Sequence, residues 1–338
     1  MSLMSKIKEN CKKFGFIYTF FFILQKLGFK IEIPINSLLK KQHYYENLSM
    51  QEKKDELCRF YKNSTGKELN IENPTTFCEK LQWMKFNDST KEKALLSDKY
   101  LAPKIIEKKY GNRIKTVKQL GEGWKDANDI DFERLPKSFV LKCNHGSAMN
   151  IIVKDKSRLN IKKTIKKLNN WLKIDYATVN GMYENHYSLI DRKIIAEEFI
   201  QEMDGNLHDY KFHCFNGIPK FCQLIGDRVP NSHHYFMSFY TSDWKKLDLT
   251  YNNHELYKKD FPVPEKFSEM LSLAADMSKD FSYVRVDFYL LNNEIYFSEL
   301  TFTPDSGIMN FNPLQADLDW GNMLKLPQHP QSGTTECL

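Results

Sequence analysis

The sequence lacks the patterns that identify several common enzyme classes. It contains no G-x-x-x-x-G-K-[ST] loop, no G-x-G-x-x-G fingerprint and no G-x-S-x-G elbow, so P-loop NTPases, Rossmann dinucleotide enzymes and α/β-hydrolases lose support. None of the seven cysteines forms a C-x-x-C pair, and their odd number argues against a complete disulfide framework. We therefore interpret them as reduced thiols in a cytoplasmic protein.

A membrane-spanning segment is also missing from the sequence pattern. The apolar run at 14–24 (FGFIYTFFFIL) is about 11 residues long, against the roughly 20 that a bilayer requires, and no small-residue cleavage site follows it. We expect a buried or partner-facing helix there. A peripheral contact of residues 14–24 with the cytoplasmic face of a membrane stays open as the alternative.

What the sequence does have is the composition of an ordinary soluble protein. The 338 residues are 41% hydrophobic and 27% charged, and a chain of this length usually forms two or three compact units. The formal charge is +6, but the 49 basic residues are interspersed with 43 acidic ones. This indicates a mild preference for anionic ligands such as phosphates, and we expect no nucleic-acid partner. The composition indicates no oligomeric state.

Periodicity and turn residues predict helices in the first part of the chain and mostly strands later. The Asn216-Gly217 and Asn292-Asn293 pairs predict hairpin turns. Helical patterns occupy 40–70, 79–86, 98–109, 162–173 and 263–280, and strand patterns occupy 138–144, 149–155, 193–200, 209–228 and 284–301.

The hairpin pattern at 284–301 places three charged residues on one face. Arg285 lies two residues before Asp287, and Glu299 can face Asp287 from the next strand. Two adjacent buried carboxylates are costly unless a cation offsets them, and their hard oxygens suit Mg²⁺, with a nucleotide supplying further oxygens. The alternative is a pair of ordinary surface carboxylates on an edge hairpin.

A lysine lies within the buried-strand pattern FVLKCNHGSA. Lys142 is flanked by apolar residues, so its ammonium needs an anionic partner, and the backbone N–H groups around Gly146 and Ser147 offer donors to the same anion. A phosphate would satisfy both, whereas the alternative is a lysine that extends to solvent. His145 either contacts the phosphate, transfers a proton, or is only a polar loop residue.

Two further strand patterns carry neighbouring charges. The run at 194–200 contains Glu197 and Glu198, and its backbone edge could hold a flat heterocycle, although a solvated strand end explains the pattern equally well. Asp209 and Lys211 lie on one face of a strand by the period of two. An ordinary cross-strand ion pair would also account for them.

Six segments in a fixed order resemble a known family. TFCEKLQWMKF, SDKY, FVLKCNHGSAMNI, DYKFHCFNG, VRVDFY and FSELTFTPDSG are together similar to the TupA-like branch of the ATP-grasp superfamily, over about residues 72–327. The resemblance implies an α+β ATP-grasp fold, in which two α+β lobes clamp ATP after a mainly helical N-terminal region. The implied divisions are 1–48 (N-terminal helical segment), 49–135 (region before the grasp), 136–200 (small lobe), 201–327 (large lobe) and 328–338 (tail).

The resemblance also implies roles in binding ATP. Lys142 and Lys211 would hold phosphates, and Glu197 with the backbones of Glu198 and Ile200 would hold the adenine edge. The other implied nucleotide contacts come from the phosphate loop and from one ribose or phosphate-side carboxylate: His145, Gly146, Ser147, Ala148, Met149 and Asp209.

The hairpin is implied to carry the metal and the catalytic arginine. Asp287 and Glu299 would bridge Mg²⁺ to the β- and γ-phosphates. Arg285 would face the transferred phosphoryl group or the acyl phosphate, and together with Lys142 and Lys211 it would form the catalytic set. Many superfamily members carry Asn where this chain has Thr301, a weaker oxygen ligand, which puts a second metal in doubt. Without metal the two carboxylates would repel each other, so an amide at either position is not expected to destabilise the fold.

The implied reaction is ATP-dependent ligation. A carboxylate takes the γ-phosphoryl group, and an amine then displaces phosphate from the acyl phosphate to give an amide. The branch is associated with teichuronopeptide, capsule and other bacterial surface-polysaccharide synthesis, so we expect small-molecule or sugar-linked carboxylates and amines as substrates. One alternative is a kinase-type phosphotransferase. Another is a sugar-nucleotide glycosyltransferase, with D-L-D at 317–319 as its metal motif.

Overall fold

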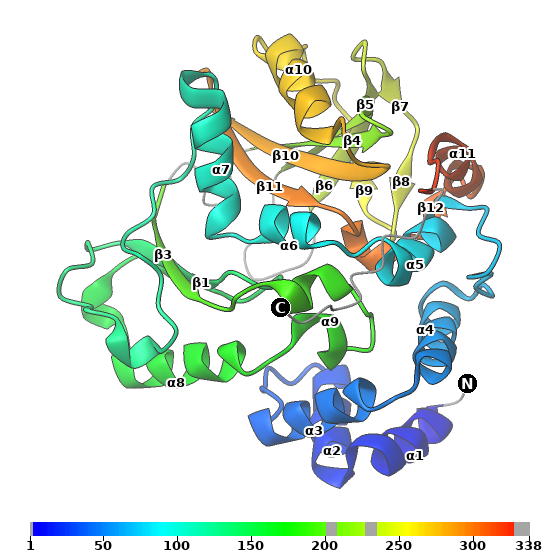
Figure 1. Cartoon of the computed structure of the whole chain (residues 1–338), viewed down its shortest axis with the longest axis vertical. Coiled ribbons are helices and arrows are strands. Elements are labelled where there is room, and N and C mark those ends of the chain that lie inside the picture. The colour runs from blue at the N-terminus through cyan, green and yellow to red at the C-terminus, as the bar shows by residue number, and fades with distance from the viewer. Residues whose placement is uncertain (1–2, 201–207, 227–234, 328–338) are drawn as a thin grey trace.

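Two antiparallel β-sheets occupy the middle of the protein, with helices around them (Figure 1). The computed structural model describes residues 3–200, 208–226 and 235–327. Within these residues every pair of neighbouring strands is antiparallel except β6 with β9, and helices both precede and separate the strands. The predicted α+β class is therefore confirmed.

The strands form a small and a large sheet. The small sheet has the order β2-β1-β3, the large sheet has the order β11-β10-β4-β5-β6-β7 with β9 paired to β6, and β8 pairs with β12. Their bounds are β1 (Phe139–Cys143), β2 (Asn150–Val153), β3 (Ile194–Glu198), β4 (Asp209–Phe215), β5 (Ile218–Gly226), β6 (Phe236–Thr241), β7 (Lys246–Leu247), β8 (Thr250–Tyr251), β9 (Glu255–Leu256), β10 (Tyr283–Leu291), β11 (Glu294–Thr301) and β12 (Phe311–Asn312).

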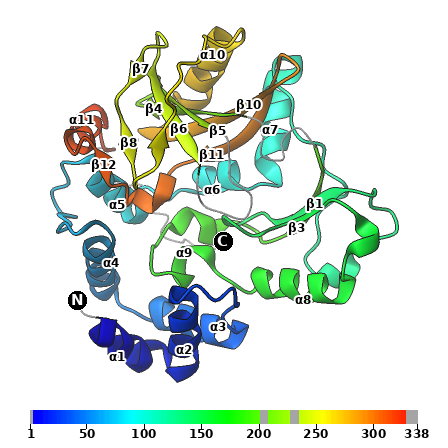
Figure 2. The same ribbon diagram turned by 180° about the vertical axis from the view of Figure 1, so that it is seen from behind.

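The helices fall into groups along the chain. Helices α1 to α4 gather at one end of the molecule, opposite the end that carries α10, in both views (Figure 2). The bounds are α1 (Leu3–Phe14), α2 (Phe16–Lys26), α3 (Ile35–Glu46), α4 (Met50–Thr65), α5 (Phe77–Asn87), α6 (Lys91–Ser97), α7 (Leu101–Tyr110), α8 (Ile161–Leu172), α9 (Tyr176–Val179), α10 (Phe267–Ser278) and α11 (Gln315–Met323), with short 3₁₀ turns at Gly111–Arg113, Ala127–Asp129, Lys156–Arg158, Asn185–Leu189 and Pro304–Gly307.

Side chains alternate between the two faces of β10, so that one face packs in the core and the other carries the charged residues. Val284, Val286 and Phe288 are fully buried in the cluster that α7 and α10 complete, as expected for one face of a strand. Arg285 and Asp287 therefore lie on the opposite face of the sheet. At one end of that face, α5 and α11 pack in a second, largely aromatic cluster around Trp320.

The two predicted hairpin turns are present. Asn216 and Gly217 have φ of 49° and 78°, and Asn292 and Asn293 have φ of 52° and 59°, so both turns use the left-handed region that tight two-residue hairpins require. They connect β4 to β5 and β10 to β11. The strands of the small sheet fall within 136–200 and β4 to β11 fall within 201–327, but the domain boundaries themselves stay a prediction.

The N-terminal helices have their own core. Phe14, Tyr18, Tyr45 and Leu57 are buried in one cluster that joins α1 to α4. The start of α4 is fixed by a capping box, in which Ser49 and Glu52 satisfy each other's backbone N–H groups. Among the described residues, no helix has the length and apolar character needed to cross a membrane.

Three buried histidines are predicted to make stability depend on pH. Burial lowers the pKa of His145 to about 4, with Arg192 adding to the effect. Burial also lowers the pKa of His186 and of His213 to about 3, helped by Lys93 and Arg285 respectively. The unfolded chain takes up these protons near pH 6.5, but the folded chain does not.

The free energy of unfolding should therefore fall as the pH is lowered from 7 to 5, by at most about 2 kcal/mol per histidine. Urea unfolding at both pH values measures this. In the control variant His186→Phe the loss should be smaller, and a wild-type protein equally stable at pH 7 and pH 5 would contradict the prediction.

Candidate active site

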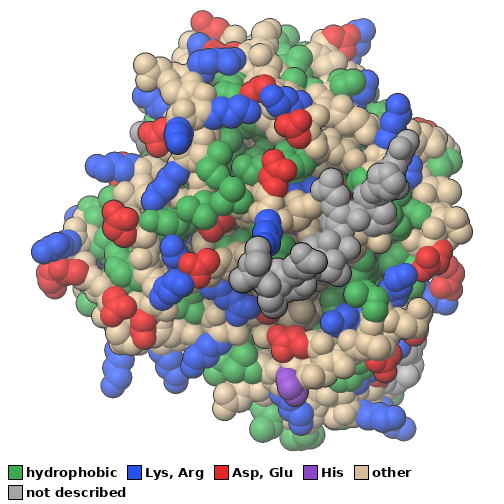
Figure 3. Space-filling view, in the orientation of Figure 1, with side chains coloured by type: hydrophobic (Ala, Val, Ile, Leu, Met, Phe, Trp, Pro, Cys, Tyr) green, Lys and Arg blue, Asp and Glu red, His purple; other side chains and the backbone are tan. Residues whose placement is uncertain are grey.

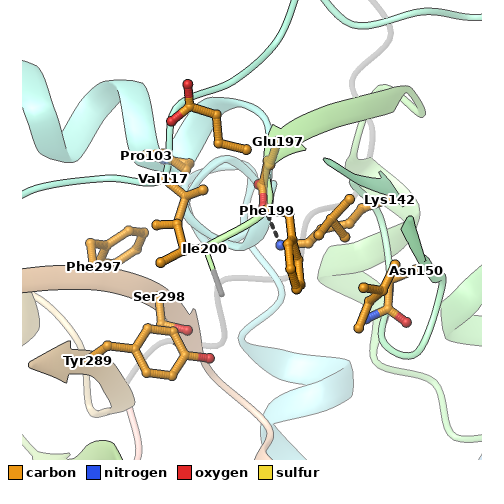
Figure 4. A pocket seen from close by; sticks show the side chains of 13 residues that line it. Pro103, Val117, Lys142, Asn150, Glu197, Phe199, Ile200, Tyr289, Phe297 and Ser298 are labelled. Carbon is orange, nitrogen blue, oxygen red and sulfur yellow. Dashed lines mark hydrogen bonds and ion pairs between the residues drawn. The ribbon is translucent and has the colours of Figure 1, made fainter. Parts of the chain in front are cut away.

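A cleft lies between the small sheet and the edge of the large sheet. Its first pocket is mainly apolar at one end, where Val117 and Ile200 lie near Phe297 of β11 (Figure 4). The other lining residues come from both sheets, from α7 and from the segments beside β3: Pro103, Val140, Lys142, Asn150, Ile152, Glu197, Glu198, Phe199, Tyr289 and Ser298.

A second pocket continues the cleft towards the charged end. It shares six residues with the first, Lys142 and Glu197 among them. It brings together most of the residues predicted to contact a nucleotide: Lys142, Gly146, Ser147, Ala148, Met149, Glu197, Asp209, Lys211 and Glu299. A cleft with an apolar end and a charged end suits a ligand with a flat base and a chain of phosphates.

Lys142 has an anionic partner within the cleft. Its ammonium forms an ion pair with Glu197, which lies on the adjacent strand, and the two side chains point towards each other (Figure 4). The N–H of Glu198 donates to the carbonyl of Lys118 at 2.9 Å. The N–H of Glu198 is therefore already used. The carbonyl of Glu198 and the backbone of Ile200, which lines the first pocket, are the groups that we expect to contact a heterocycle beside β3.

The loop between β1 and β2 is held in a fixed position. Asn144 is buried, and its side chain donates to Asp98 and to the carbonyl of Asp191, both at 2.9 Å. A Cβ on Gly146 would lie 2.7 Å from the ring of Tyr176, so only glycine fits against that ring. Ala148 has a φ of 59°, which turns the loop over the second pocket.

A row of charges crosses three strands of the large sheet. Lys211 of β4 lies opposite Asp287 of β10, which lies opposite Glu299 of β11. The next row places Arg285 opposite Thr301. A β-bulge after Asp287 shifts the register of β11, and bulges of this kind often aim side chains at functional sites. The predicted convergence of these side chains is found.

Asp287 is fully buried and paired with two cations. Arg285 donates to it through Nε and Nη2, both at 2.7 Å, and Lys211 forms a further ion pair with it. Arg285 Nη2 also reaches Glu299 at 3.0 Å and Thr301 at 3.1 Å. The expected repulsion between the two carboxylates is present, since Asp287 by itself raises the pKa of Glu299. Arg285 bonds both of them and offsets this repulsion without metal, so an amide at Asp287 is no longer expected to be harmless.

The charges around Glu299 favour its ionised form. Burial by itself raises the pKa of Glu299, but Lys99, Lys211 and Arg285 together outweigh burial and the neighbouring Asp287, so the pKa lies below its ordinary value. Glu299 therefore carries a negative charge at neutral pH. A hard anionic oxygen is thus present at the edge of the second pocket.

The structure does not bring His145 into the cleft. Its ring is buried on the other side of the loop, where Nε2 lies 3.1 Å from the carbonyl of Ile174. With a pKa lowered to about 4 by burial and by Arg192, it is neutral at physiological pH. Its contacts hold the loop to the segment before α9, and it makes no contact with either pocket.

Sequence reasoning missed several residues that line the second pocket. Lys99 belongs to the quoted segment SDKY, but its charge was not assigned a role. Tyr289 lies two residues after Asp287 in β10, so the period of two could have placed it on the same face. Asn150 and Ser298 carried no signal, since their positions depend on the hairpin and on the bulge.

A buried lysine beneath the site was also missed. The ammonium of Lys85 in α5 is fully buried and donates to the Gln82 side chain at 2.8 Å and to the carbonyl and hydroxyl of Ser306 at 2.9 and 2.8 Å. Burial lowers the pKa of Lys85 to about 8, although Glu184 counteracts this.

These contacts support a strained turn. Asp305 and Ser306 have φ of 47° and 50°, a region that costs energy for residues other than glycine. The turn follows shortly after β11, and Ser306 lies five residues beyond Thr301, the last residue of that strand. Strained backbone held by buried donors next to a row of charges is typical of a site that positions a substrate.

The oxygens of the large-sheet face fit Mg²⁺ shared with phosphates. Asp287, Glu299 and Thr301 offer carboxylate and hydroxyl oxygens, the ligands that Mg²⁺ takes. Within the described ranges no three acidic, histidine or cysteine side chains group as a complete metal site. A magnesium site usually has one or two carboxylates, and phosphates and water complete it.

The D-L-D motif at 317–319 has a structural explanation. Asp317 is buried in the first turn of α11, accepts from the backbone N–H of Cys78 at 3.0 Å and faces Lys67 at 3.4 Å. Asp319 accepts from Gln315 on the surface. The motif therefore ties α11 to α5 and lies away from both pockets.

The fold and the cleft define an ATP-grasp protein, a class that binds ATP with Mg²⁺ and consists mainly of ATP-dependent ligases. The chain belongs to the TupA-like ATP-grasp family, which matches residues 79–325. No curated protein shows significant similarity to the sequence.

Several solved structures share the fold at a distance. A D-alanine–D-alanine ligase from Bacillus anthracis is 18% identical, with a TM-score of 0.38, over 63% of this chain and 58% of that enzyme. A phosphoribosylamine–glycine ligase from Thermotoga maritima is 15% identical, with a TM-score of 0.39, over 65% of this chain and 51% of that enzyme. The match thus spans little more than half of each enzyme.

The buried pairs of Asp287 predict its effect on stability. Asp287→Asn should destabilise the protein by about 3–5 kcal/mol without nucleotide or metal, because it removes the carboxylate shared by two buried cations and leaves Arg285 only its bond to Glu299. Glu299→Gln should cost much less, since the Glu299 side chain is 37% exposed and Arg285 keeps Asp287. Urea unfolding with a chelator present measures both. Equal stability of Asp287→Asn and wild type would contradict the account.

The support beneath the turn predicts a separation of turnover from nucleotide binding. Lys85→Met should lower Mg²⁺-dependent ADP release at least about tenfold while ATP affinity is retained, because the turn loses both Lys85 bonds to Ser306 and keeps only those from Gln82, whereas the cleft is unchanged. Lys80→Met is the matched control, since Lys80 on the same helix donates to the carbonyls of Gly321 and Leu324 at 2.7 and 2.8 Å instead. Equal effects of the two variants on turnover would show that Lys85 only stabilises the fold.

Proposed function

We propose that this protein is an ATP-dependent carboxylate–amine ligase that forms an amide through an acyl phosphate. The observation that carries the proposal is the face on which Lys211, Arg285, Asp287 and Glu299 meet, at the end of a cleft that is apolar at its other end. Family membership supports the use of ATP there.

In this proposal the residues of the cleft contact different parts of the nucleotide and its metal. The backbones of Glu198 and Ile200 hold the adenine edge, with Glu197 beside them. Lys142 and the loop 146–149 hold the phosphates, and Asp209 contacts the ribose or a phosphate. When bound, Mg²⁺ would be held by Asp287, Glu299 and Thr301 and would neutralise phosphate charge.

The proposed chemistry needs positioning and charge compensation. An oxygen of the substrate carboxylate attacks the γ-phosphorus, the bond from that phosphorus to the β–γ bridging oxygen breaks, and ADP leaves. Arg285 and Lys211 compensate the charge on the transferred phosphoryl group. The amine nitrogen then attacks the acyl carbon, phosphate leaves with the bonding electrons, and the nitrogen loses a proton to give the amide.

The substrate class rests on the family alone. The resemblance to the TupA-like branch supports a sugar-linked carboxylate or amine, or an amino acid, in bacterial surface-polysaccharide synthesis, and a cytoplasmic site of action where ATP is available. We propose small-molecule substrates for the same reason. In this proposal the turn 304–307 contacts the acceptor; its bracing by Lys85 and its position just after β11 support this role.

The ligase proposal is tested by ADP release in pools of sugar acids and amino acids. ADP should appear only with Mg²⁺ and a carboxylate, and hydroxylamine in place of the amine should trap the acyl phosphate as a hydroxamate. Release that needs a hydroxyl compound and yields a stable phosphate ester would instead identify a kinase. ADP release that requires neither a carboxylate nor a hydroxyl compound would overturn both the ligase and the kinase proposals.

Lys142→Ala is expected to weaken ATP binding by about tenfold or more, since a charged contact to phosphate is lost from a partly buried cleft. Isothermal titration calorimetry with ATP and Mg²⁺ measures this affinity. Lys125→Ala is the matched control, because Lys125 forms an exposed pair with Asp191 at 2.8 Å outside the cleft. Wild-type affinity in Lys142→Ala would remove the lysine from the site.

A further inference from the structure

Helix α2 is apolar on two opposite faces. Its inner face is anchored, because Tyr18 is buried and Phe22 packs in the cluster formed with α1, α3 and α4. A helix that is apolar all round normally has both faces covered. The inner contacts account for only one of them.

Exposed apolar side chains lie in the first half of α2 and just beyond its end. Phe16, Ile17 and Phe20 are 74%, 59% and 47% exposed, and Leu27 and Phe29 beyond the helix end are 67% and 57% exposed. Phe16 and Phe20 lie one turn apart with stacked rings 6.2 Å from centre to centre. We call these five residues the outer face of α2. Hydrophobic side chains at the lower edge of the space-filling view, over α2, show its position (Figure 3).

The charges around the outer face have one sign. Exposed lysines are found before, after and beside α2: Lys8, Lys12, Lys30 and Lys40, with Lys26 at the end of the helix, where its ammonium lies over the ring of Phe22. The acidic residues of α1 and of the segment after α2 are already paired. Glu9 bonds Lys13 at 2.7 Å and Arg59 at 3.0 Å, and Glu32 bonds Lys167 at 2.8 Å. The surroundings of the apolar face are therefore cationic.

These charges distinguish between the partners that could cover the face. A second copy of this chain, docked face to face, would bring lysines against lysines, which costs energy at every close pair. An anionic lipid surface instead offers phosphate groups to the lysines and acyl chains to the aromatic side chains. No described helix is long and apolar enough to cross a bilayer, so α2 would lie in the plane of the interface.

We propose that the outer face of α2 inserts into the headgroup region of an anionic phospholipid membrane, with the surrounding lysines on lipid phosphates. The face lies at the end of the molecule opposite α10 (Figure 1). The cleft between the sheets lies away from it and stays accessible to ATP. This attachment would hold the protein next to membrane-bound substrates, and it does not depend on the reaction proposed above.

The test is flotation of the full chain with lipid vesicles. Wild-type protein should float with phosphatidylcholine–phosphatidylglycerol vesicles, much less with phosphatidylcholine alone, and less as salt increases, because counterions screen the lysine contacts. The triple variant Phe16→Ser, Ile17→Ser, Phe20→Ser should stay at the bottom of the gradient. The double variant Lys26→Glu, Lys30→Glu should lose the preference for anionic vesicles.

A matched control uses exposed apolar residues elsewhere. Val263 and Leu314 are 58% and 66% exposed, and Val263→Ser with Leu314→Ser should float like wild type. The melting temperature of each variant shows whether it is folded. The proposal is overturned if folded wild type does not float with anionic vesicles, or if the triple variant floats equally well. It is also overturned if neither protein binds vesicles and light scattering shows that the wild type is a dimer whereas the triple variant is a monomer.

Discussion

The buried carboxylate of Asp287 is the group on which the arrangement of the site depends. It cannot stay ionised in the sheet without compensation, and Arg285 and Lys211 supply that compensation from its own strand and from the neighbouring strand. The same arginine then reaches Glu299 and Thr301. One buried charge thus fixes four other side chains across three strands.

This compensation has a consequence for ligand binding. Two cations and two carboxylates balance on the face of β4, β10 and β11, so the site is stable before any ligand enters. A nucleotide with its metal brings both signs of charge, and the protein groups can exchange partners with little change in net charge. The cost of separating buried ions is then offset by new ion pairs of the same kind, which allows the site to stay folded through a reaction cycle.

Local patterns predicted the parts of the site that depend on strand periodicity. The spacing of Arg285 and Asp287 was sufficient to place both on one face of β10, and the turn at 292–293 to pair β10 with β11. That turn alone would set Asp287 opposite Ser298, so the bulge after Asp287, which no sequence pattern indicated, is what brings Glu299 into the row. The sequence could not show which way His145 points, since this depends on a carbonyl at Ile174. Nor could it show that Lys85 supports a turn about 220 residues later, because that contact is set by packing of α5 on the large sheet.

The most direct test of the central claim is a crystal structure of the protein with Mg²⁺ and a non-hydrolysable ATP analogue. We expect Arg285 and Lys211 to contact the terminal phosphate, Asp287 and Glu299 to hold the metal, and the base to lie against Ile200 and Phe297. A triphosphate bound elsewhere, while Arg285 keeps both of its bonds to Asp287, would contradict this claim.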